Sequence, residues 1–537
     1  MLFHAPMENT PPPRRPLYDL WPWLVVLFVL LLVAFIRFRL LDMPLERDEG
    51  EYAYAGQLLL QGIPPYQLAW NMKLPGTYFA YALGMALFGP TSAGIHATLM
   101  VVNSLTIIFV FLLARKLFGT AAGLAACATF GILSASPAVL GLAAHANHFV
   151  ILFAVPATLL LWKAEEANRP GILFWSGLLY GLAFVMKQQG ICFCLFAVAV
   201  VFVNAIQNKI VLSGVFFKKI ILLGLAMLLP FALTCMYLWQ AGVFAKFWFW
   251  TFTYAGTYAA EVTAREGLVK FFDYLHKKWM VYFVFVGFIA ISLPFMARNR
   301  TLRKQILFAA AFLLFSFLGT AIDLNFREHY FILFLPGIAL FVGLALAALQ
   351  DAGSGPFQKL LAPVSCVLVL GFSIFLQRSF FFQLPANAAS AIIYYGDAPF
   401  TAMPNVGDYI RAHSATNATV AVVGSEPEVY FYARRHSATG YLYMYPLMEP
   451  QPYAAQMQRE MISEVSSNTP DFLVFVPSAD SWNVRSNSDQ TIFHWFNQYS
   501  RDYAAVASFG PTVLVGDKMV QMQSLPVTIF QRKAPVH

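Results

Sequence analysis

Long hydrophobic runs recur along this chain, and they restrict its fold more than any other feature of the sequence. Most are close to the ~20 residues that an α-helix needs to cross a bilayer. Charged residues make up only 12% of the chain, against about 25% in a typical soluble domain. The pattern predicts a polytopic α-helical membrane protein with eleven spans, at residues 20–41, 95–114, 120–141, 146–162, 171–187, 190–206, 219–240, 279–297, 305–322, 330–349 and 359–377.

Two hydrophobic segments need separate interpretation. The first run lacks a small-residue cleavage site and more spans follow it, so we expect a retained helix rather than a signal peptide. The run Gly76–Phe88 follows Pro75 and has about 13 residues, which is short for a crossing. We expect it to be an interfacial or re-entrant helix.

Basic residues then set the predicted orientation. If Gly76–Phe88 does not cross, the basic loops fall on one side of the membrane, which is the cytoplasmic side in the positive-inside pattern. The N-terminus is then cytoplasmic, and loops 42–94 and 241–278 and everything past 378 are external. The net charge of +8 therefore indicates orientation rather than nucleic-acid binding. The basic groups are Arg14, Arg15, Arg115, Lys116, Lys163, Arg169, Lys209, Lys218, Lys219, Arg298, Arg300, Arg303, Lys304 and Lys359.

Residues 379–537 differ in character from the rest of the chain. This tail is more polar and contains no predicted span. Strand-like segments at Thr419–Val423, Phe472–Val476 and Val527–Gln531 alternate with helical patterns at 405–413, 426–433 and 456–466. We therefore predict two domains, a transmembrane domain over 1–378 and an external α/β domain over 379–537. The five cysteines all lie in apolar runs, which argues against a disulfide framework.

Four carboxylates follow the first span within six positions: Glu46, Asp48, Glu49 and Glu51. Ionised side chains at a membrane surface are costly unless they are paired, solvated or used. A carboxylate cluster there suits proton abstraction from a hydroxyl next to a lipid-anchored substrate. We expect Glu46 and Glu51 to be solvated.

The same loop contains a recognisable series of motifs. Asp48-Glu49 is followed by a helical stretch, then by Gly62-Ile63-Pro64-Pro65-Tyr66, then by Lys73-Leu74-Pro75-Gly76. This series resembles the first external loop of the polyprenyl-phosphate-dependent GT-C glycosyltransferases, in the branch of bacterial relatives of protein O-mannosyltransferases and lipid A aminoarabinose transferases. Weaker similarities follow in order: RKLFG at 115–119, GLAFVMKQQG at 181–190 and REHYFILFLP at 327–336.

The resemblance implies a GT-C fold, residence in a bacterial inner membrane, and transfer of a sugar from a polyprenyl-phosphate carrier to a lipid, glycan or protein on the external face. It implies that Asp48 is the base that deprotonates the acceptor, with inversion at the glycosyl carbon. Glu49 is expected to tune Asp48, hold a metal or bind the acceptor. The alternative for Asp48 is a surface ion pair with Arg47 or Arg327.

The leaving phosphate of such a donor needs cations. Lys73 lies in the Lys-Leu-Pro-Gly motif, and Lys187 lies on the outer side, where positive-inside statistics disfavour lysine. Arg327 and His329 lie at the outer end of the tenth predicted span, and arginine suits bidentate phosphate contacts. We predict that these four residues bind the donor phosphate. The alternatives are snorkelling lysines and an internal pair of Arg327 with Glu328.

Further polar and aromatic residues near these positions are predicted to contact substrate: Tyr52, Tyr66, Asn147, His148, Gln188 and Tyr330. Relatives commonly have an acidic residue where we align Asn147, so a metal bridged by two acids is in doubt here. His145 and His148 are weak candidates for a cation. The sequence indicates no certain cofactor and leaves a divalent metal open.

Two other function classes remain to be weighed. Transporters or flippases of lipid-linked sugars typically show internal repeats and charges near the bilayer midplane, whereas here ionisable groups gather at the outer surface and we find no repeat. A non-catalytic binder of lipid-linked sugar would not need Asp48 specifically.

Overall fold

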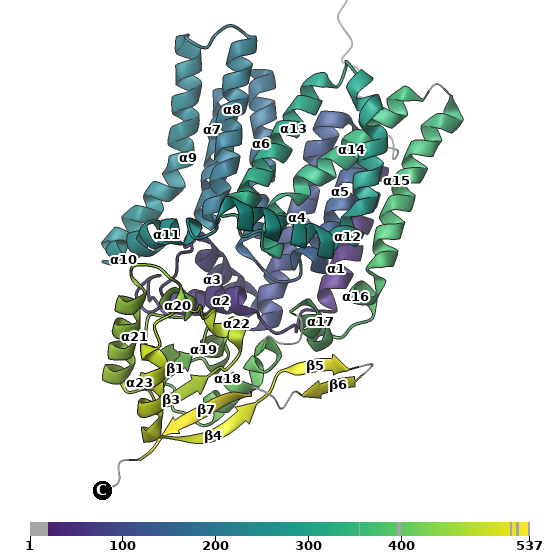
Figure 1. Ribbon diagram of the computed structural model, residues 1–537. Coiled ribbons are helices and arrows are strands. Elements are labelled where there is room, and N and C mark those ends of the chain that lie inside the picture. The colour runs from purple at the N-terminus through teal and green to yellow at the C-terminus, as the bar shows by residue number, and fades with distance from the viewer. Residues whose placement is uncertain (1–19, 354, 395–398, 516–517, 522–525, 535–537) are drawn as a thin grey trace, which may run out of the picture.

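The fold is a bundle of long helices joined to a smaller α/β unit (Figure 1). We describe it from a computed structural model that covers residues 20–353, 355–394, 399–515, 518–521 and 526–534. Arg14, Arg15 and the proline-rich segment Pro11–Pro13 lie outside the described residues.

All eleven predicted runs form helices, whose bounds are α1 Trp21–Phe38, α4 Ser92–Phe118, α5 Thr120–Ser134, α6 Ala146–Ala167, α7 Pro170–Met186, α8 Ile191–Gln207, α9 Gly214–Gln240, α12 Ala264–Arg298, α13 Arg303–Ala321, α14 Leu335–Ala352 and α15 Pro356–Leu376. Among the described residues, nine helices are long and apolar enough to cross a membrane. That count takes α8 together with the preceding turn as Gln188–Gln207, and α5 with 15 residues and α7 with 17 lie within the same bundle.

The helices sort into central and peripheral ones. Most residues of α6 and α14 are buried, whereas α9 buries only Leu223, Ala226, Pro230 and Leu238. The outward faces of peripheral helices are apolar, as at Leu24 and Phe28 of α1. Such faces are suited to lipid, because lipid tails are as apolar as these side chains.

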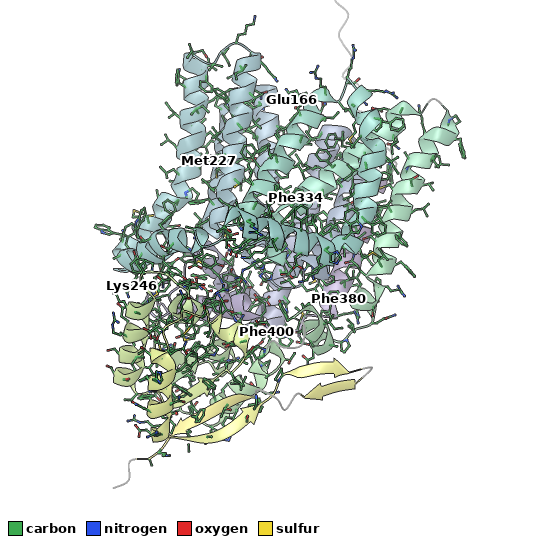
Figure 2. All side chains as sticks on the ribbon, viewed as in Figure 1. Glu166, Met227, Lys246, Phe334, Phe380 and Phe400 are labelled. Carbon is green, nitrogen blue, oxygen red and sulfur yellow. The ribbon has the colours of Figure 1, made fainter. Side chains whose placement is uncertain are left out.

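Short helices lie between the bundle and the α/β unit. These are α2 (Arg47–Leu60) and α3 (Gly76–Phe88), together with α10 (Phe244–Trp248) and α11 (Ala255–Ala259) from the loop 241–278 (Figure 1). Helix α3 packs beside α2, and the expectation that Gly76–Phe88 does not cross stays a prediction. The turn between α8 and α9 lies at the opposite end of the bundle, and so does Glu166, which pairs with Lys116 (Figure 2).

Within the described residues, five strands form the sheet of the α/β unit, in the order β2-β1-β3-β7-β4. Strands β1 (Thr419–Val423), β2 (His436–Ser437) and β3 (Phe472–Phe475) are parallel, with Val420 opposite Phe472. Strands β7 (Val527–Arg532) and β4 (Tyr503–Phe509) continue the sheet antiparallel. A separate hairpin joins β5 (Thr512–Val515) and β6 (Lys518–Gln521).

Helices cover both faces of this sheet, as the alternation of side chains along a strand requires. On one face Ala421 and Val423 pack against α21 (Ala454–Asn468) and α23 (Thr491–Tyr499). On the other face Val420 and Val422 pack against α18 (Met403–Ala412) and α19 (Glu428–Ala433). The remaining helices of the unit are α16 (Arg378–Phe382), α17 (Ala386–Ile393), α20 (Tyr445–Met448) and α22 (Ala479–Trp482).

One hydrophobic core joins the sheet unit to the loop after the first span. Tyr54 and Leu58 of α2 belong to the same buried cluster as Val422 and Tyr430, and the Tyr54 and Tyr430 rings lie 5.1 Å apart. The helix that contains the predicted base is therefore enclosed between the membrane helices and the sheet unit. The predicted boundary at 378/379 stays a prediction, because this core crosses it.

Candidate active site

Asp48 lies in the first turn of α2, and local sequence explains why the helix begins there. The carboxylate of Glu46 accepts a hydrogen bond from the backbone N–H of Glu49 (2.9 Å), and Glu49 reciprocates toward the N–H of Glu46 (3.3 Å). This capping box satisfies orphan donors at the helix start. It turns Asp48 toward a partly open site, where its side chain is 22% exposed.

Lys73 bridges two of the four carboxylates. Its ammonium lies 2.6 Å from Asp48 Oδ1 and 2.6 Å from Glu51 Oε2, and 4.6 Å from the ring centroid of Tyr52. Burial alone would raise the pKa of Asp48, but the Lys73 ammonium holds it well below its usual value. Asp48 is thus kept ionised, with Oδ1 occupied and Oδ2 turned toward two histidines.

Several expectations for the acidic cluster are corrected. Glu51 is 1% exposed and accepts hydrogen bonds from Lys73, Tyr78 and Asn71, so it is not solvated. Glu46 is also buried. Burial and the neighbouring Asp48 carboxylate raise its pKa, because a second charge in this space is costly.

The alternative ion pairs of Asp48 do not form among the described residues. Arg47 instead pairs with Glu426, at 2.8 Å. Arg327 donates to the Tyr258 hydroxyl, at 3.2 Å.

Glu49 has a supporting position next to Asp48, and its expected role in tuning Asp48, holding a metal or binding the acceptor stays a prediction. Its side chain is fully buried and accepts hydrogen bonds from the backbone N–H of Ala144 (2.6 Å) and from His96 Nε2 (3.1 Å). These contacts attach α2 to α4 and to the loop before α6. The reason is geometric, because adjacent residues on a helix point about 100° apart.

Two stacked histidines face Asp48. The rings of His145 and His329 are nearly parallel, with centroids 4.1 Å apart, and both approach Asp48 Oδ2, at 3.9 and 3.8 Å. Burial lowers the pKa of His145 to about 4, and burial and His145 lower that of His329. Both rings are therefore neutral at pH 7.

These three residues could hold a metal ion. Asp48, His145 and His329 each offer a ligand atom, and the three atoms lie within 4.8 Å of one another. Neither nitrogen of His145 has a hydrogen-bond partner among the residues that the structure describes, although the side chain is buried. One carboxylate and two neutral imidazoles suit Zn²⁺ and similar divalent ions.

Lys187 lies on the other side of the histidines, between α7 and the 3₁₀ helix η3 (Gln188–Gly190). It donates to Asn147 Oδ1 (2.9 Å), and Asn147 in turn donates to Gln189 (3.0 Å). The Tyr330 ring centroid is 4.3 Å from its ammonium. Burial lowers the pKa of Lys187 to about 7, partly offset by Asp48 and Asp323.

The predicted cations share one electrostatic neighbourhood. The charges of Lys73 and Arg327 both lower the pKa of Lys187, which means that each of them repels the Lys187 ammonium. Arg327 is exposed and directly precedes η5 (Glu328–Leu333), the 3₁₀ turn that contains His329 and Tyr330. The predicted pairing of Arg327 with Glu328 is not among the ion pairs of the described residues.

Two other predicted substrate residues, Tyr66 and Gln188, support the loop that contains Lys73. The Tyr66 hydroxyl donates to the backbone carbonyl of Lys73 (2.6 Å), and Gln188 Nε2 donates to that of Met72 (2.6 Å). Both contacts fix the loop that delivers Lys73. His148 is buried within α6, and neither of its nitrogens has a partner in the described part of the chain.

The structure adds residues that the sequence did not indicate. The Tyr443 hydroxyl lies 3.4 Å from both Asp48 Oδ1 and Lys73 Nζ. Tyr443 comes from the C-terminal unit, 395 positions after Asp48. No local sequence pattern predicts a contact between residues this far apart. It follows only from the packing of the C-terminal unit against the loop after the first span.

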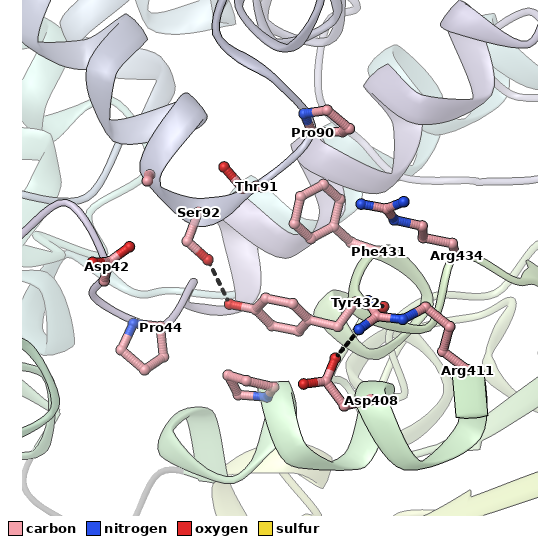
Figure 3. Close-up of a pocket in the computed structure, with 12 residues that line it drawn as sticks. Asp42, Pro44, Pro90, Thr91, Ser92, Asp408, Arg411, Phe431, Tyr432 and Arg434 are labelled. Carbon is pink, nitrogen blue, oxygen red and sulfur yellow. Dashed lines mark hydrogen bonds and ion pairs between the residues drawn. The ribbon is translucent and has the colours of Figure 1, made fainter. Parts of the chain in front are cut away.

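A cavity of about 270 Å³ opens along the same junction (Figure 3). Ser92 of α4 and Tyr432 of α19 face each other across it, with their hydroxyls 3.0 Å apart. An ion pair between Asp408 and Arg411 forms another part of the wall. None of the predicted site residues lines this cavity, so it marks the junction rather than the candidate site.

Part of this chain is similar in sequence to known proteins. Residues 73–234 match the family model described as dolichyl-phosphate-mannose-protein mannosyltransferase. A curated relative, the undecaprenyl phosphate-alpha-4-amino-4-deoxy-L-arabinose arabinosyl transferase of Pseudomonas aeruginosa strain LESB58, is 31% identical over 177 residues. That match covers 29% of this chain and 31% of the relative.

Similarity to solved structures covers nearly the whole chain. The crystal structure of ArnT from Cupriavidus metallidurans bound to undecaprenyl phosphate matches with a TM-score of 0.61 at 13% identity, over 96% of this chain and 98% of that one. The archaeal oligosaccharyltransferase AglB from Archaeoglobus fulgidus, in complex with an inhibitory peptide and a dolichol-phosphate, matches with a TM-score of 0.52 at 12% identity, over 94% and 74%. The chain therefore has the GT-C membrane fold.

Proposed function

We propose that this chain, which has the GT-C fold, is an integral membrane glycosyltransferase that moves a sugar from a polyprenyl-phosphate donor to an acceptor. The observation that supports this most is the juxtaposition of an ionised Asp48 with a group of cations at one end of the helix bundle. The curated relative and the ArnT structure, each named for undecaprenyl phosphate, support a polyprenyl carrier.

In the proposed reaction, Asp48 Oδ2 accepts the proton of the acceptor hydroxyl. The acceptor oxygen then forms a bond to the glycosyl carbon as the bond from that carbon to the phosphate oxygen breaks. Polyprenyl phosphate leaves without needing a proton, so one carboxylate suffices and the configuration inverts. Lys73 keeps Asp48 ionised and oriented through the bond to Oδ1.

Lys187 and Arg327 bind the departing phosphate in this proposal, with His329 beside them. Arginine offers a bidentate fork and lysine a compact charge. Lys73 is already shared by two carboxylates, so it contributes positive charge next to the phosphate rather than the main contact. Tyr330 and Asn147 hold Lys187 in place.

A divalent cation is an alternative arrangement of this site, because Asp48 Oδ2, which faces both histidines, cannot hold an ion and accept the acceptor proton at the same time. Asp48, His145 and His329 would hold it, and the orphan nitrogens of the buried His145 support the fit. Such an ion would place positive charge beside the leaving phosphate. Metal analysis of the purified protein, with turnover measured before and after chelation, tests this; full turnover of a metal-free protein rules the ion out.

Turnover by the purified protein tests the main proposal. The protein in lipid vesicles, supplied with an undecaprenyl-phosphate-linked sugar and candidate acceptors, should release undecaprenyl phosphate and glycosylate one acceptor. Mass spectrometry of cell-envelope glycans and lipids, with and without the protein, identifies the acceptor class. A transporter or flippase would move the donor without consuming it, and a binding protein would retain it unchanged.

The proposed location is the inner membrane of a bacterium, with the N-terminus in the cytoplasm and the α/β unit outside. Supporting this, Glu166 lies at the end of the bundle far from that unit (Figure 2), where it pairs with Lys116, and the adjacent Glu165 pairs with Lys219. Basic residues gather on the cytoplasmic side of membrane proteins.

A further inference from the structure

Tyr443 connects the C-terminal unit to the charged centre of the candidate site. It lies between β2 and α20, and only 7% of it is exposed. Its hydroxyl is 3.1 Å from the backbone carbonyl of Arg47 and 3.4 Å from both Asp48 Oδ1 and Lys73 Nζ. The Lys73 ammonium also lies 5.3 Å from the Tyr443 ring centroid.

The Tyr443 hydroxyl can donate only one hydrogen bond, so the next question is which of these groups accepts it. A tyrosine has one proton to donate, and burial raises the pKa of Tyr443, so the proton stays on the oxygen. The shortest contact identifies the Arg47 carbonyl as the main acceptor. The oxygen lone pairs then remain for the Lys73 ammonium, which has donors only.

The same C-terminal unit fixes the helix turn next to Asp48. The Arg47 guanidinium donates to the carbonyl of Ser425 (2.6 Å) and to Glu426 (2.8 Å). It also lies 5.3 Å from the ring centroid of Tyr445. The C-terminal unit therefore holds both Arg47, which precedes Asp48 in the helix, and Lys73, which pairs with the Asp48 side chain.

We infer that Tyr443 is a positioning residue for the Asp48–Lys73 pair, so that the C-terminal unit completes the active site. This rests on the proposed function. Tyr443 contacts Asp48 and Lys73, whereas Lys187 and Arg327 bind the donor phosphate in the proposed function. Loss of the hydroxyl should therefore slow the transfer step and leave donor binding unchanged.

The test compares Tyr443→Phe with Tyr441→Phe in the purified full-length protein. Tyr441 lies in the same loop, but its hydroxyl binds Glu460, away from Asp48. Hydrogen bonds to charged groups make the larger contributions, so Tyr443→Phe should lower kcat about 10-fold with an unchanged KM for the donor. Tyr441→Phe should stay near the wild type. Thermal unfolding in detergent verifies that both variants fold.

Two further measurements exclude a merely structural role. Combined with Asp48→Asn, Tyr443→Phe should cause little additional loss, because residues in one network are not additive. Independently of turnover, Lys73 should react faster with an amine-directed reagent in Tyr443→Phe but not in Tyr441→Phe, as read by mass spectrometry.

An unchanged kcat, a fully additive loss, or equal Lys73 reactivity in both variants would overturn the inference. A wild type without turnover would instead refute the proposed function, and the Lys73 reactivity would still decide the role of Tyr443.

Discussion

Asp48 is kept ionised by the same contact that weakens it as a base. Lys73 at 2.6 Å holds the pKa of Asp48 well below its usual value, and a general base works best when its pKa is near the working pH. A donor phosphate that attracted the Lys73 charge would raise the pKa of Asp48. We therefore expect the carboxylate to become a better base once donor is bound.

Replacement of Asp48 by asparagine tests its role. Asp48→Asn preserves the size of the side chain and removes the base, so turnover should fall by about 10²- to 10⁴-fold. Donor binding should persist, because cations hold the phosphate. The control is Asp42→Asn, a neutralised carboxylate in the same loop that is exposed. Near-normal turnover of Asp48→Asn would place the base elsewhere.

Lys187 should make donor binding dependent on pH. Burial lowers its pKa to about 7, so its charge is present below pH 7 and is lost as the pH rises through 7. If the donor phosphodiester binds only the charged form, donor affinity should fall about 10-fold between pH 6 and pH 8. Arginine keeps its charge over this range, so Lys187→Arg should flatten the curve. A wild-type affinity that is flat between pH 6 and 8 contradicts the assignment.

At the scale of elements, the packing of α2 against α19 requires a residue without a Cβ at the point of closest approach. A Cβ at Gly50 would lie 2.5 Å from both the Cβ and the backbone nitrogen of Glu428, whereas a Cβ at Gly56 would mainly meet the mobile end of Met85, at 2.6 Å. Gly50→Ala should therefore lower the free energy of unfolding by about 1–3 kcal/mol, as overpacking does.

Gly56→Ala is the matched control on the same helix. It should cost less, since the Met85 side chain can move and alanine favours a helix by about 1 kcal/mol over glycine. Thermal unfolding in detergent compares the two variants. Equal midpoints would show that α2 and α19 can separate without cost.

The elements were largely predictable from local sequence, and their surroundings were not. The strand at Thr419–Val423 has the predicted bounds because its β-branched residues lie between turn residues. Strand β2 was missed, since two residues make no recognisable pattern. Glu46 and Glu51 were expected in solvent because the residues that enclose them are distant in sequence, as Tyr443 is.

At the scale of the whole molecule, the helix bundle follows from hydrophobic run length alone, and the GT-C fold from the ordered motifs of the first loop. Those motifs also singled out Lys73, which lies 2.6 Å from Asp48. The other partners of Lys73 and Arg47 were not predictable, because the roles of these two residues depend on Glu51 and Glu426, which no spacing rule connects to them.

The orientation of the molecule is open to a direct labelling experiment. A cysteine placed at Asn468 or Arg501, on the surface of the C-terminal unit, should react with a membrane-impermeant maleimide in intact cells, since the basic loops lie at the other end of the bundle. A cysteine placed at Asn208, between α8 and α9, serves as the control and should react only after lysis. The reverse result would invert the topology.

The core shared by α2 and the sheet unit also has a consequence for biosynthesis. Tyr54 leaves the ribosome long before Tyr430, with which its ring packs. At 5–20 residues per second, the interval is roughly 20–75 s. During that time a half-apolar helix with three acidic residues waits at the membrane surface without the partner that buries it. Synthesis rate and membrane-associated chaperones should therefore influence the yield of this protein more strongly than that of a bundle whose neighbouring elements are consecutive in sequence.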